Sequence, residues 1–323
     1  MKRYILFNPL SGNGKSEDDS ELLAKYYGGE CELKDITGIT DYAAFFSGLT
    51  DEDSVVICGG DGTLNRFVNN TVGIDIKCKI LYHASGTGND FLHDIQGNEP
   101  GDPIDVGRYL KDLPTVTVNG KSYKFINNVG FGIDGYCCEV GDEQKLTSDK
   151  PVNYTMIAIK GLLLHYKPTG ATVTVDGKEY RYENVWLAPT MKGRFYGGGM
   201  MPTPDQDRCD PNGELSVMLM YKKSKLKTLM VFPSIFKGEH VKHENMVAVH
   251  KGKNIKVVFD TPAAVQIDGE TIRGVTSYEA AASAITADAA ETAPRGYDTA
   301  IISFDQQSNK GLMPKHQSFL LLR

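Results

Sequence analysis

Short apolar segments alternate with amphipathic segments over the first part of the chain. Residues 4–7 form an apolar strand, and leucines and tyrosines at helical spacing follow over residues 17–27, which two glycines close. An extended segment at 31–36 and a helix near 41–49 come before two further strand and helix units. This regular order predicts an α/β nucleotide-binding domain over residues 1–115, with a doubly wound parallel sheet.

After Pro114 the pattern changes to short strands joined by Asn-Gly and Asp-Gly turns, which are typical of β-hairpins. Two helices interrupt these strands, near 154–166 and 225–237, and the second is expected to bend or restart at Pro233. The pattern predicts a mainly antiparallel β-sandwich domain over residues 116–278. The predicted strands lie at 116–118, 122–128, 172–175, 180–187, 215–220 and 255–259.

The last segment, residues 279–323, is rich in alanine, serine and threonine and has no clean period. We predict an atypical tail that is disordered or partly returns to the first domain, and we assign it no function.

Three predicted strands of the first domain end in turns of small, flexible and polar residues. One such turn opens with Asn8-Pro9, the second is Gly59-Gly60-Asp61-Gly62-Thr63, and the third is Gly86-Thr87-Gly88-Asn89-Asp90. The carboxyl ends of parallel strands gather at one edge of a sheet, where backbone N–H groups can hold phosphate oxygens. Taken singly, each turn could be only a tight connection, and Asn89 and Asp90 could be helix N-caps. Together they predict a nucleotide site made by Asn8, Ser11, Gly60, Gly62, Thr63, Gly86, Thr87, Gly88 and Asn89.

These turns, with Asp268-Gly269-Glu270 further on, occur in one order along roughly residues 1–275. The set resembles the catalytic-domain family of diacylglycerol kinases, most closely the soluble bacterial lipid kinases, with sphingosine and ceramide kinases as relatives. NAD kinases share the Gly-Gly-Asp-Gly turn, but the Asn8-Pro9 opening favours the lipid-kinase branch. The resemblance implies ATP as phosphoryl donor, Mg²⁺ as cofactor and a lipid hydroxyl as acceptor. It also implies that the nine positions of the predicted nucleotide site bind ATP.

Asp61 stands between glycines at the end of a strand, where packing gives no reason for a carboxylate that would repel a phosphate. A magnesium ion between the two resolves this conflict, because carboxylate and water oxygens are its usual ligands. Asp61 is therefore expected to orient the metal and is one candidate for the general base. Glu270 is the second candidate, by resemblance, although Asp-Gly followed by a polar residue is also a common hairpin turn.

A further acidic region follows a run of glycines at 197–199, where bacterial lipid kinases of this type carry a structural magnesium site. Asn212 and Ser216 stand where further acidic residues are expected, so a solvated acidic turn remains the alternative. The predicted metal ligands of the whole chain are Asp61, Asp90, Asp207 and Asp210.

The composition narrows the class of protein. The chain has 323 residues, 41% hydrophobic and 24% charged, and its net charge of −6 argues against nucleic acid as a partner. No apolar run approaches the roughly 20 residues needed to cross a bilayer, so we expect a cytoplasmic protein without a transmembrane segment. The six cysteines lack a framework spacing and are expected to be free thiols.

Lysines flank apolar residues over 222–232, a pattern of basic amphipathic helices that bind membrane surfaces. We therefore expect peripheral association with membrane lipid, the alternative being a solvated helix face. Exposed edge strands of two copies of the chain can pair with each other, so the sequence allows a homodimer. Two other functions are weighed against lipid phosphorylation: a soluble small-molecule kinase resembling NAD kinases, and a nucleotide- or lipid-binding regulator without turnover.

Overall fold

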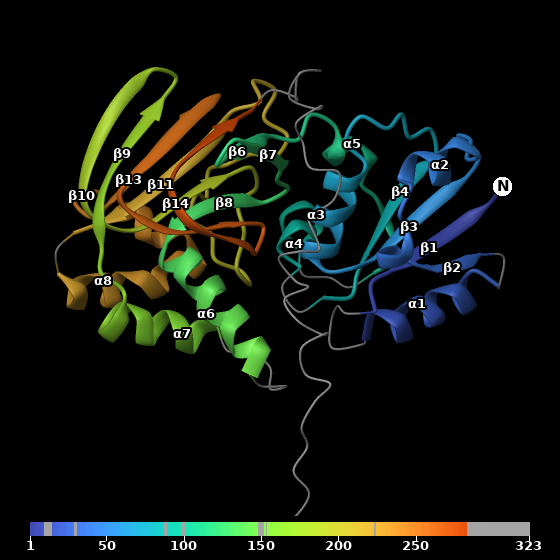
Figure 1. The fold of residues 1–323 in the computed structure, drawn as a ribbon, viewed down its shortest axis with the longest axis horizontal. Helices are drawn as coiled ribbons and strands as arrows, with labels where there is room; N and C mark the ends of the chain where they lie inside the picture. Colours follow the sequence, from blue (N-terminus) through green and yellow to red (C-terminus); the bar gives the residue numbers. More distant parts are fainter. Residues whose placement is uncertain are drawn as a thin grey trace, which may run out of the picture.

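Two β-sheets lie side by side in the computed structural model, each with its own helices (Figure 1). The first sheet belongs to the amino-terminal part of the chain and the second to the rest. The structure describes residues 1–9, 15–28, 31–86, 89–97, 101–147, 152, 154–222 and 224–282.

The first sheet has five strands in the order β2-β1-β3-β4-β5. The first four of these strands run parallel, and only β5 is antiparallel to its neighbour β4. The strands are β1 (Arg3–Phe7), β2 (Glu32–Asp35), β3 (Ser54–Gly59), β4 (Lys79–Ala84) and β5 (Ile104–Asp105). The order reverses at β1 and β3, so the carboxyl ends of β1, β3 and β4 meet at one edge, where ligands bind in doubly wound sheets.

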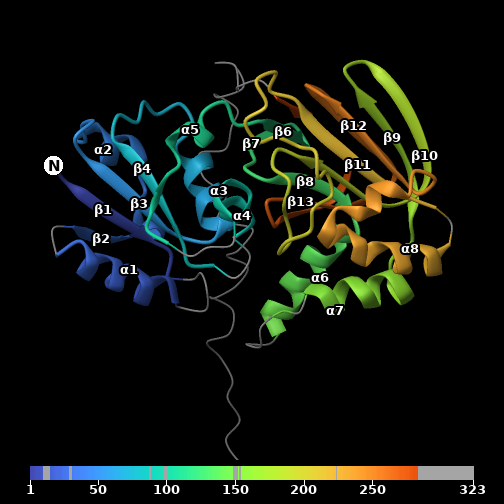
Figure 2. The same cartoon turned by 180° about the vertical axis from the view of Figure 1, so that it is seen from behind.

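Helices cover both faces of this sheet. This is required because successive side chains of β3 point to opposite faces and all of them are buried. Val55 and Ile57 pack with residues of the helices on one face, whereas Val56 and Cys58 pack with Leu23 of α1 on the other. From behind, α1 lies below the sheet and α2 above it (Figure 2). The helices are α1 (Lys15–Tyr26), α2 (Tyr42–Ser47), α3 (Asp61–Asn70), α4 (Asp90–Gln96) and α5 (Gly107–Leu110), with a 3₁₀ turn η2 (Ile36–Gly38). The predicted doubly wound fold is confirmed.

The second sheet is antiparallel, and two-residue turns make three of its hairpins. Asn119, Asp176 and Asp268 have φ of 51°, 46° and 46°, and each is followed by a glycine that also has positive φ. Positive φ at both central residues matches the turn that follows the twist of paired strands. The strands are β6 (Thr115–Val118), β7 (Lys121–Lys124), β8 (Asn128–Gly132), β9 (Thr169–Val175), β10 (Lys178–Met191), β11 (Leu215–Tyr221), β12 (Val247–Gly252), β13 (Asn254–Ile267) and β14 (Glu270–Ala281).

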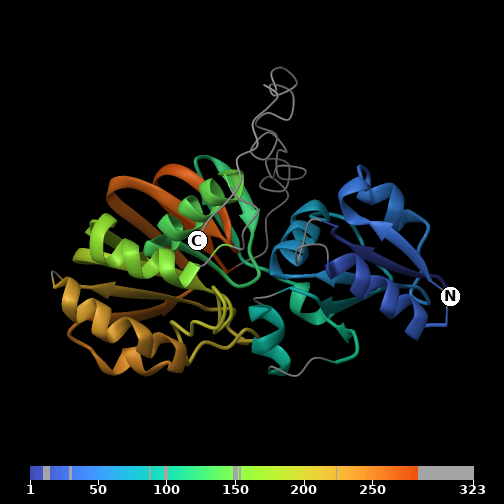
Figure 3. The same cartoon turned by 90° about the horizontal axis from the view of Figure 1, so that it is seen from below.

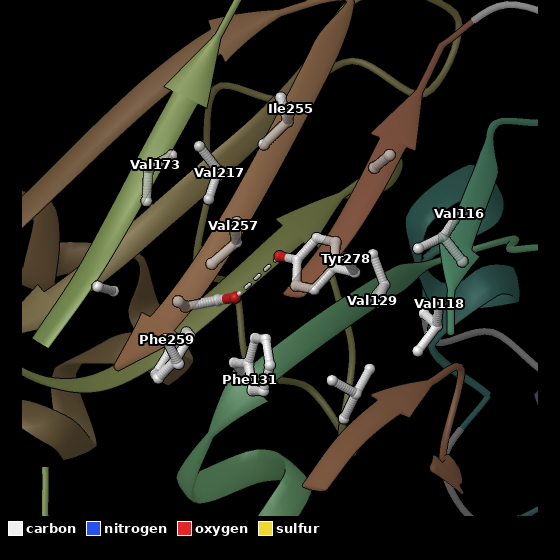
Figure 4. Packing of buried hydrophobic residues seen from close by; sticks show 14 of the residues in the cluster. Val116, Val118, Val129, Phe131, Val173, Val217, Ile255, Val257, Phe259 and Tyr278 are labelled. Atoms are coloured by element: carbon white, nitrogen blue, oxygen red, sulfur yellow. Dashed lines mark hydrogen bonds between the residues drawn. The ribbon is translucent and has the colours of Figure 1, made fainter. Parts of the chain in front are cut away.

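Two long strands, β10 and β13, turn this sheet into a sandwich. The first halves of both strands pair with β9, and their second halves pair with β8. The register of β10 shifts between Tyr182 and Val185, and that of β13 between Val258 and Ala263, so both strands bend between the layers. Valines, Phe131, Phe259 and Tyr278 from the two layers fill the space between them (Figure 4). The β-sandwich prediction is confirmed.

Three helical segments cover one side of the second sheet, whereas only two were predicted. The additional helix is α6 (Ile133–Thr147), which the sequence pattern hid because Gly135 and Gly141 lie inside it. Both glycines allow close packing: a Cβ on Gly135 would lie 2.1 Å from the Ala264 carbonyl oxygen, and one on Gly141 would lie 2.6 Å from the Tyr154 ring.

The two predicted helices are present, and both change their winding before they end. The first is α7 (Tyr154–Lys160), which continues as one π-turn, η3 (Gly161–His165). The second is α8 (Lys225–Val231), which continues as the 3₁₀ segments η4 (Phe232–Lys237) and η5 (Glu239–Lys242). The change in the second comes next to Pro233, as predicted. Residues 279–281 belong to β14, and the predicted tail from 283 onward lies outside the described residues.

Candidate active site

Two of the three predicted glycine turns touch each other at the carboxyl edge of the first sheet. A Cβ on Gly86 would lie 2.7 Å from the Cα of Gly60, so only glycine allows this approach. The Ser85 N–H donates to the Gly59 carbonyl over 3.0 Å, and the Asn8 side-chain amide donates to the Thr63 hydroxyl over 3.5 Å. The described parts of the three turns therefore form one surface.

Two further residues of the predicted nucleotide site, Gly62 and Asn89, are among the described residues. Gly62 is exposed and nothing lies near the position of a Cβ there, whereas Asn89 donates its side-chain amide to the Gly86 carbonyl over 2.8 Å. Asn89 occupies the N-cap position of α4 without accepting a hydrogen bond there. Ser11, Thr87 and Gly88 lie outside the described residues. The nucleotide role of these residues stays a prediction.

The carboxylate of Asp61 is the group that caps α4. It accepts the N–H of Asp90 over 2.8 Å and that of Phe91 over 3.3 Å, and the side-chain amide of Asn127 donates to it over 3.2 Å. The expectation that packing gives no reason for Asp61 is therefore wrong: a helix N-terminus 29 residues away holds it. Burial, with the nearby charges of Asp90 and Asp268, still raises the pKa of Asp61 to about 8.

Asp90 connects the first domain to the glycine run of the second. Its two carboxylate oxygens accept the N–H groups of Gly198 and Gly199 over 2.8 Å and 2.7 Å. The Asp90 side chain is buried, and this burial raises its pKa although the two N–H groups counteract it. Both oxygens are therefore occupied by backbone donors, and its metal role stays a prediction.

Asp94, one helical turn after Asp90, makes the second link between the domains. It accepts hydrogen bonds from Arg208 and Arg194, each at 2.8 Å, and the side chains of Asp94 and Arg208 are only 2% and 4% exposed. Arg208 also donates to the Asn127 side-chain oxygen over 2.7 Å. The pair is a buried, multiply hydrogen-bonded ion pair, so removal of one partner would strongly destabilise the domain contact.

Asp268, in the turn between β13 and β14, holds the residues that join the domains. It accepts the N–H groups of Ile126, Asn127 and Asn128 over 2.6, 2.8 and 2.9 Å. The side-chain amide of Asn65 in α3 adds a fourth bond of 2.6 Å. Burial raises the pKa of Asp268, and the four donors oppose that effect. Asn127 therefore stands between Asp268 and Asp61 and fixes their relative position.

A cavity of about 380 Å³ lies where these groups meet. Its polar end contains Asp61, Asp90, Asn127 and Asp268, together with Asp134, whose pKa burial raises to about 7. The rest of the wall is mainly apolar and comes from the helical layer of the second domain, from Leu187 of β10 and from Tyr196 and Met200 in the loop after β10. These residues are Ile133, Cys137, Cys138, Tyr154, Ala158, Leu187, Tyr196, Met200, Phe232 and Phe236.

Glu270 begins β14, next to Gly269 of the cavity wall. It is half-buried, and burial raises its pKa while Arg66 counteracts the rise. Asp61 therefore faces the cavity directly, and Glu270 lies one residue behind its wall.

The acidic residues after the glycine run have other contacts. Asp207 accepts the Cys209 N–H over 2.8 Å, and Asp210 accepts the Asn212 N–H over 2.7 Å and pairs with Lys251. Within the described part of the chain, no group of three or more histidine, cysteine or acidic residues could hold a metal ion. The structure thus does not bring Asp207 and Asp210 together with Asp61, and their metal role stays a prediction.

Sequence reasoning missed Asp94, Arg208, Asn127 and Asp134 as residues of this site. Asp94 carried one usable signal, because it lies four residues after Asp90 and so on the same face of a helix. Arg208 stands within an acidic turn and contacts a residue 114 positions away, so no local pattern marks it.

The two halves of the chain match two known protein domains. Residues 2–116 match the diacylglycerol kinase catalytic domain, and residues 127–294 match the YegS C-terminal NAD kinase beta sandwich-like domain. The chain belongs to the diacylglycerol kinase-like family. The predicted resemblance is thereby confirmed.

Relatives of the family cover most of the chain. A "Diacylglycerol kinase" of Mycobacterium tuberculosis is 28% identical over 279 residues, 79% of this chain and 84% of that protein. One of Bacillus subtilis is 26% identical over 292 residues, 84% of this chain and 90% of that protein. A crystal structure of a diacylglycerol kinase from Bacillus anthracis aligns with a TM-score of 0.53 at 17% identity, covering 87% of this chain and 93% of the other. That structure supports the fold. Within the described residues, no helix is long and apolar enough to cross a membrane.

Proposed function

We propose that this chain transfers the γ-phosphoryl group of ATP to a hydroxyl of diacylglycerol or a related lipid. The observation that carries the proposal is the cavity, which has carboxylates beside two touching glycine turns at one end and an apolar wall along the rest. A phosphoryl acceptor with a polar head and acyl chains matches both parts.

The nucleotide is proposed to lie on the described turn residues Asn8, Gly60, Thr63 and Gly86. Phosphoryl transfer depends mainly on positioning and on stabilising charge, so backbone N–H groups at a helix start suit this role. The close contact of Gly60 and Gly86 leaves these N–H groups without side chains in front of them.

The donor chemistry fits a magnesium ion that arrives with the nucleotide better than one bound by the protein alone. Of the four predicted ligands, Asp61 and Asp90 line the cavity, and only Asp61 has an oxygen whose backbone bond is as long as 3.3 Å, whereas both Asp90 oxygens accept N–H groups over 2.7–2.8 Å. Magnesium commonly takes one or two carboxylates with phosphates and waters. Asp61 is the residue that would hold it. When bound, the ion would neutralise charge on the transferred phosphoryl group.

The acceptor proton has two candidate bases. Asp61 faces the cavity, and its pKa of about 8 suits proton transfer near neutral pH. Glu270 stands behind Gly269 and would need a small movement of the turn to reach the cavity. The pH profiles of Asp61→Asn and Glu270→Gln distinguish the two, because loss of the base removes the acidic limb of kcat.

The test is a product assay with labelled ATP and Mg²⁺, offered mixed lipid micelles in one reaction and NAD in another. Lipid phosphorylation gives label that partitions into organic solvent, and this is the expected result. Label that stays in water only with NAD would favour an NAD kinase-like enzyme. Nucleotide binding without transfer to any alcohol would favour a non-catalytic regulator.

Calorimetry adds a test of the magnesium role. We expect ATP to bind more weakly when a chelator removes divalent cations, because Asp61 then faces the triphosphate directly. Equal affinity with and without the chelator would contradict the proposed part of Asp61.

A further inference from the structure

Two buried hydrogen-bond donors in the cavity wall have no partner in the protein. Seven buried polar side-chain atoms of the described residues lack a hydrogen-bond partner among those residues. Only two of the seven belong to residues that line the cavity: the side-chain amide nitrogen of Asn128 and the hydroxyl of Tyr196. A buried polar group without a partner destabilises the fold, so stability gives no reason for either group. We call these two groups the donor pair.

Other polar side chains of the cavity wall bond to the protein itself. The side chain of Asn127 donates to Asp61 over 3.2 Å and accepts from Arg208 over 2.7 Å. The Gln266 side-chain oxygen accepts the Gly269 N–H over 2.8 Å. The donor pair differs from these groups, because none of the described residues accepts its hydrogen bonds.

Asn128 begins β8, and the alternation along that strand sets the direction of its side chain. Val129 and Phe131 point into the core of the sandwich. Asn128 and Gly130 therefore lie on the opposite face, which bears the cavity. A Cβ on Gly130 would lie 2.1 Å from a carboxylate oxygen of Asp134, so glycine at this position leaves room for polar groups on the cavity face.

Tyr196 stands at the start of the glycine run 197–199, which the first domain holds in place. Tyr196 and Met200 exchange two backbone hydrogen bonds of 3.0 Å, and Asp90 accepts the N–H groups of Gly198 and Gly199. Viewed from below, the yellow segment that follows β10 lies against α4 (Figure 3). The Tyr196 ring is thus positioned before a ligand binds, which reduces the entropy lost on binding.

Both members of the donor pair lie near the polar end of the cavity. Asn128 pairs with Met191, the last residue of β10, and Tyr196 follows Met191 by five residues. Asn128 also directly follows Asn127, whose side chain bonds to Asp61. The donor pair therefore lies close to the place where the acceptor hydroxyl is proposed to react.

The chemistry of the donor pair indicates what it binds. A carbonyl oxygen has two lone pairs and no proton, so it can accept a hydrogen bond from each of two donors. An acyl lipid carries such an oxygen, in an ester or an amide, only a few bonds from its hydroxyl. An anionic group would be repelled by Asp90 and Asp134, which line the same cavity.

We propose that Asn128 and Tyr196 bind the acyl carbonyl oxygen beside the reacting hydroxyl, and so select acylated lipids over lipids without that carbonyl. This inference rests on the proposed lipid kinase function, because it names residues that recognise the acceptor of that same site. The two side chains set specificity and take no part in the transfer of the phosphoryl group.

The test compares lipids with and without the acyl carbonyl in the same mixed micelles with Mg²⁺ and ATP. One pair is dioctanoylglycerol and its ether analogue dioctylglycerol, and the other is an N-acyl sphingoid base and the free base. The wild type is expected to favour the acylated member of one pair by about tenfold or more in kcat/KM, because its absence leaves buried donors without a partner. Preference within the glycerol pair would support an ester carbonyl and preference within the sphingoid pair an amide carbonyl, whereas no preference in either pair would overturn the proposal.

Two variants remove one donor each. Tyr196→Phe and Asn128→Leu are each expected to lower kcat/KM for the favoured acylated lipid about fivefold, and to leave kcat/KM for its carbonyl-free counterpart and KM for ATP unchanged. Their unfolding temperatures should not fall below that of the wild type, because neither change removes a hydrogen bond within the described residues. An unchanged preference for the acylated lipid in both folded variants would contradict the role of the donor pair.

Tyr278→Phe is the matched control for Tyr196→Phe. Tyr278 is also a buried tyrosine of the second domain, but its hydroxyl bonds to Thr190 and it does not line the cavity. It is expected to keep the wild-type preference for the acylated lipid. Equal loss of that preference in both tyrosine variants would overturn the proposal, because any change in the domain would then have the same effect.

The same assay separates this inference from the function. Equal phosphorylation of the acylated and carbonyl-free lipids would overturn the role of the donor pair and leave the lipid kinase. If none of the four lipids is phosphorylated, the proposed function fails, and this inference fails with it.

Discussion

The two walls of the cavity are built in opposite ways. At the polar end, each of Asp61, Asp90 and Asp268 is held by backbone or amide donors at fixed distances. At the apolar end, α7 and α8 are short, and both change winding before they end. The carboxylates at the polar end are therefore fixed by directional hydrogen bonds, whereas the apolar wall is held by side-chain packing, which can adjust.

The largest expected effect removes the central carboxylate of the polar wall. Asp61→Asn is expected to lower kcat by about 10³, because it takes away the metal-orienting group and one candidate base. The fold should persist, because the replacement keeps a side-chain oxygen that can accept the Asp90 N–H. Steady-state kinetics and thermal unfolding check both statements.

Asp75→Asn is the matched control for this variant, because Asp75 is exposed in the same domain. It is expected to retain wild-type turnover. Near-normal turnover of folded Asp61→Asn would remove Asp61 from the mechanism.

The next effect concerns the bonds that hold the polar wall together. Arg208→Met leaves Asp94 buried without its main partner, and we expect a loss of about 3–5 kcal/mol in the free energy of unfolding. Lys256→Met breaks an ion pair with Glu279 whose side chains are 48% and 63% exposed, and should cost below about 1 kcal/mol. Urea unfolding measures both, and equal losses would show that the interdomain pair adds nothing beyond a surface pair.

A smaller effect is the pH dependence of stability. The folded pKa values of Asp61 and Asp134 are about 8 and about 7, above the unfolded values of about 4. Between these values the folded state binds more protons, so its stability falls as pH rises. We expect the nucleotide-free protein to lose about 5 kcal/mol between about pH 5.5 and about pH 8.5, of which Asp61 contributes the larger part. In Asp61→Asn with Asp134→Asn the curve should be flatter, and an unchanged slope would contradict the raised pKa values.

The smallest expected effect concerns Tyr196, which lines the cavity. The Tyr196 hydroxyl is buried and has no hydrogen-bond partner among the described residues. Tyr196→Phe is therefore expected to leave stability unchanged or to raise it by up to about 1 kcal/mol. Tyr278→Phe is the control, because that hydroxyl bonds to Thr190 over 2.8 Å, and its loss should cost about 1 kcal/mol. A rise in KM for lipid but not for ATP in Tyr196→Phe would show that the hydroxyl meets the acceptor.

Local chemistry made much of the fold predictable. The turns at Asn119, Asp176 and Asp268 need positive φ, and Asn-Gly and Asp-Gly pairs supply it. The contact of Gly60 with Gly86 follows from the sheet, because the two glycines come directly after the ends of β3 and β4, which are parallel neighbours. Helix α6 was missed because glycines that normally weaken a helix are used there for close packing.

The site was less predictable than the fold, because its bonds join distant parts of the chain. Asp268 looks like a turn residue, yet its carboxylate binds backbone groups about 140 positions earlier. Asp61 looks unsupported in the sequence, yet the start of the next helix holds it. Partners of this kind depend on how the two sheets pack, and no pattern within one segment records that.

Helix α4 has a consequence for how the protein can be divided. Its carboxylates Asp90 and Asp94 bind Gly198 and Arg208 of the other half. If residues 1–113 were expressed alone, the carboxylates of Asp90 and Asp94 would lose these partners and become exposed to water. In the remaining half, Arg208 would lose the carboxylate with which it pairs. The two halves are therefore not interchangeable modules, and recombining them with halves of a distant relative would require exchanging both sides of this contact together.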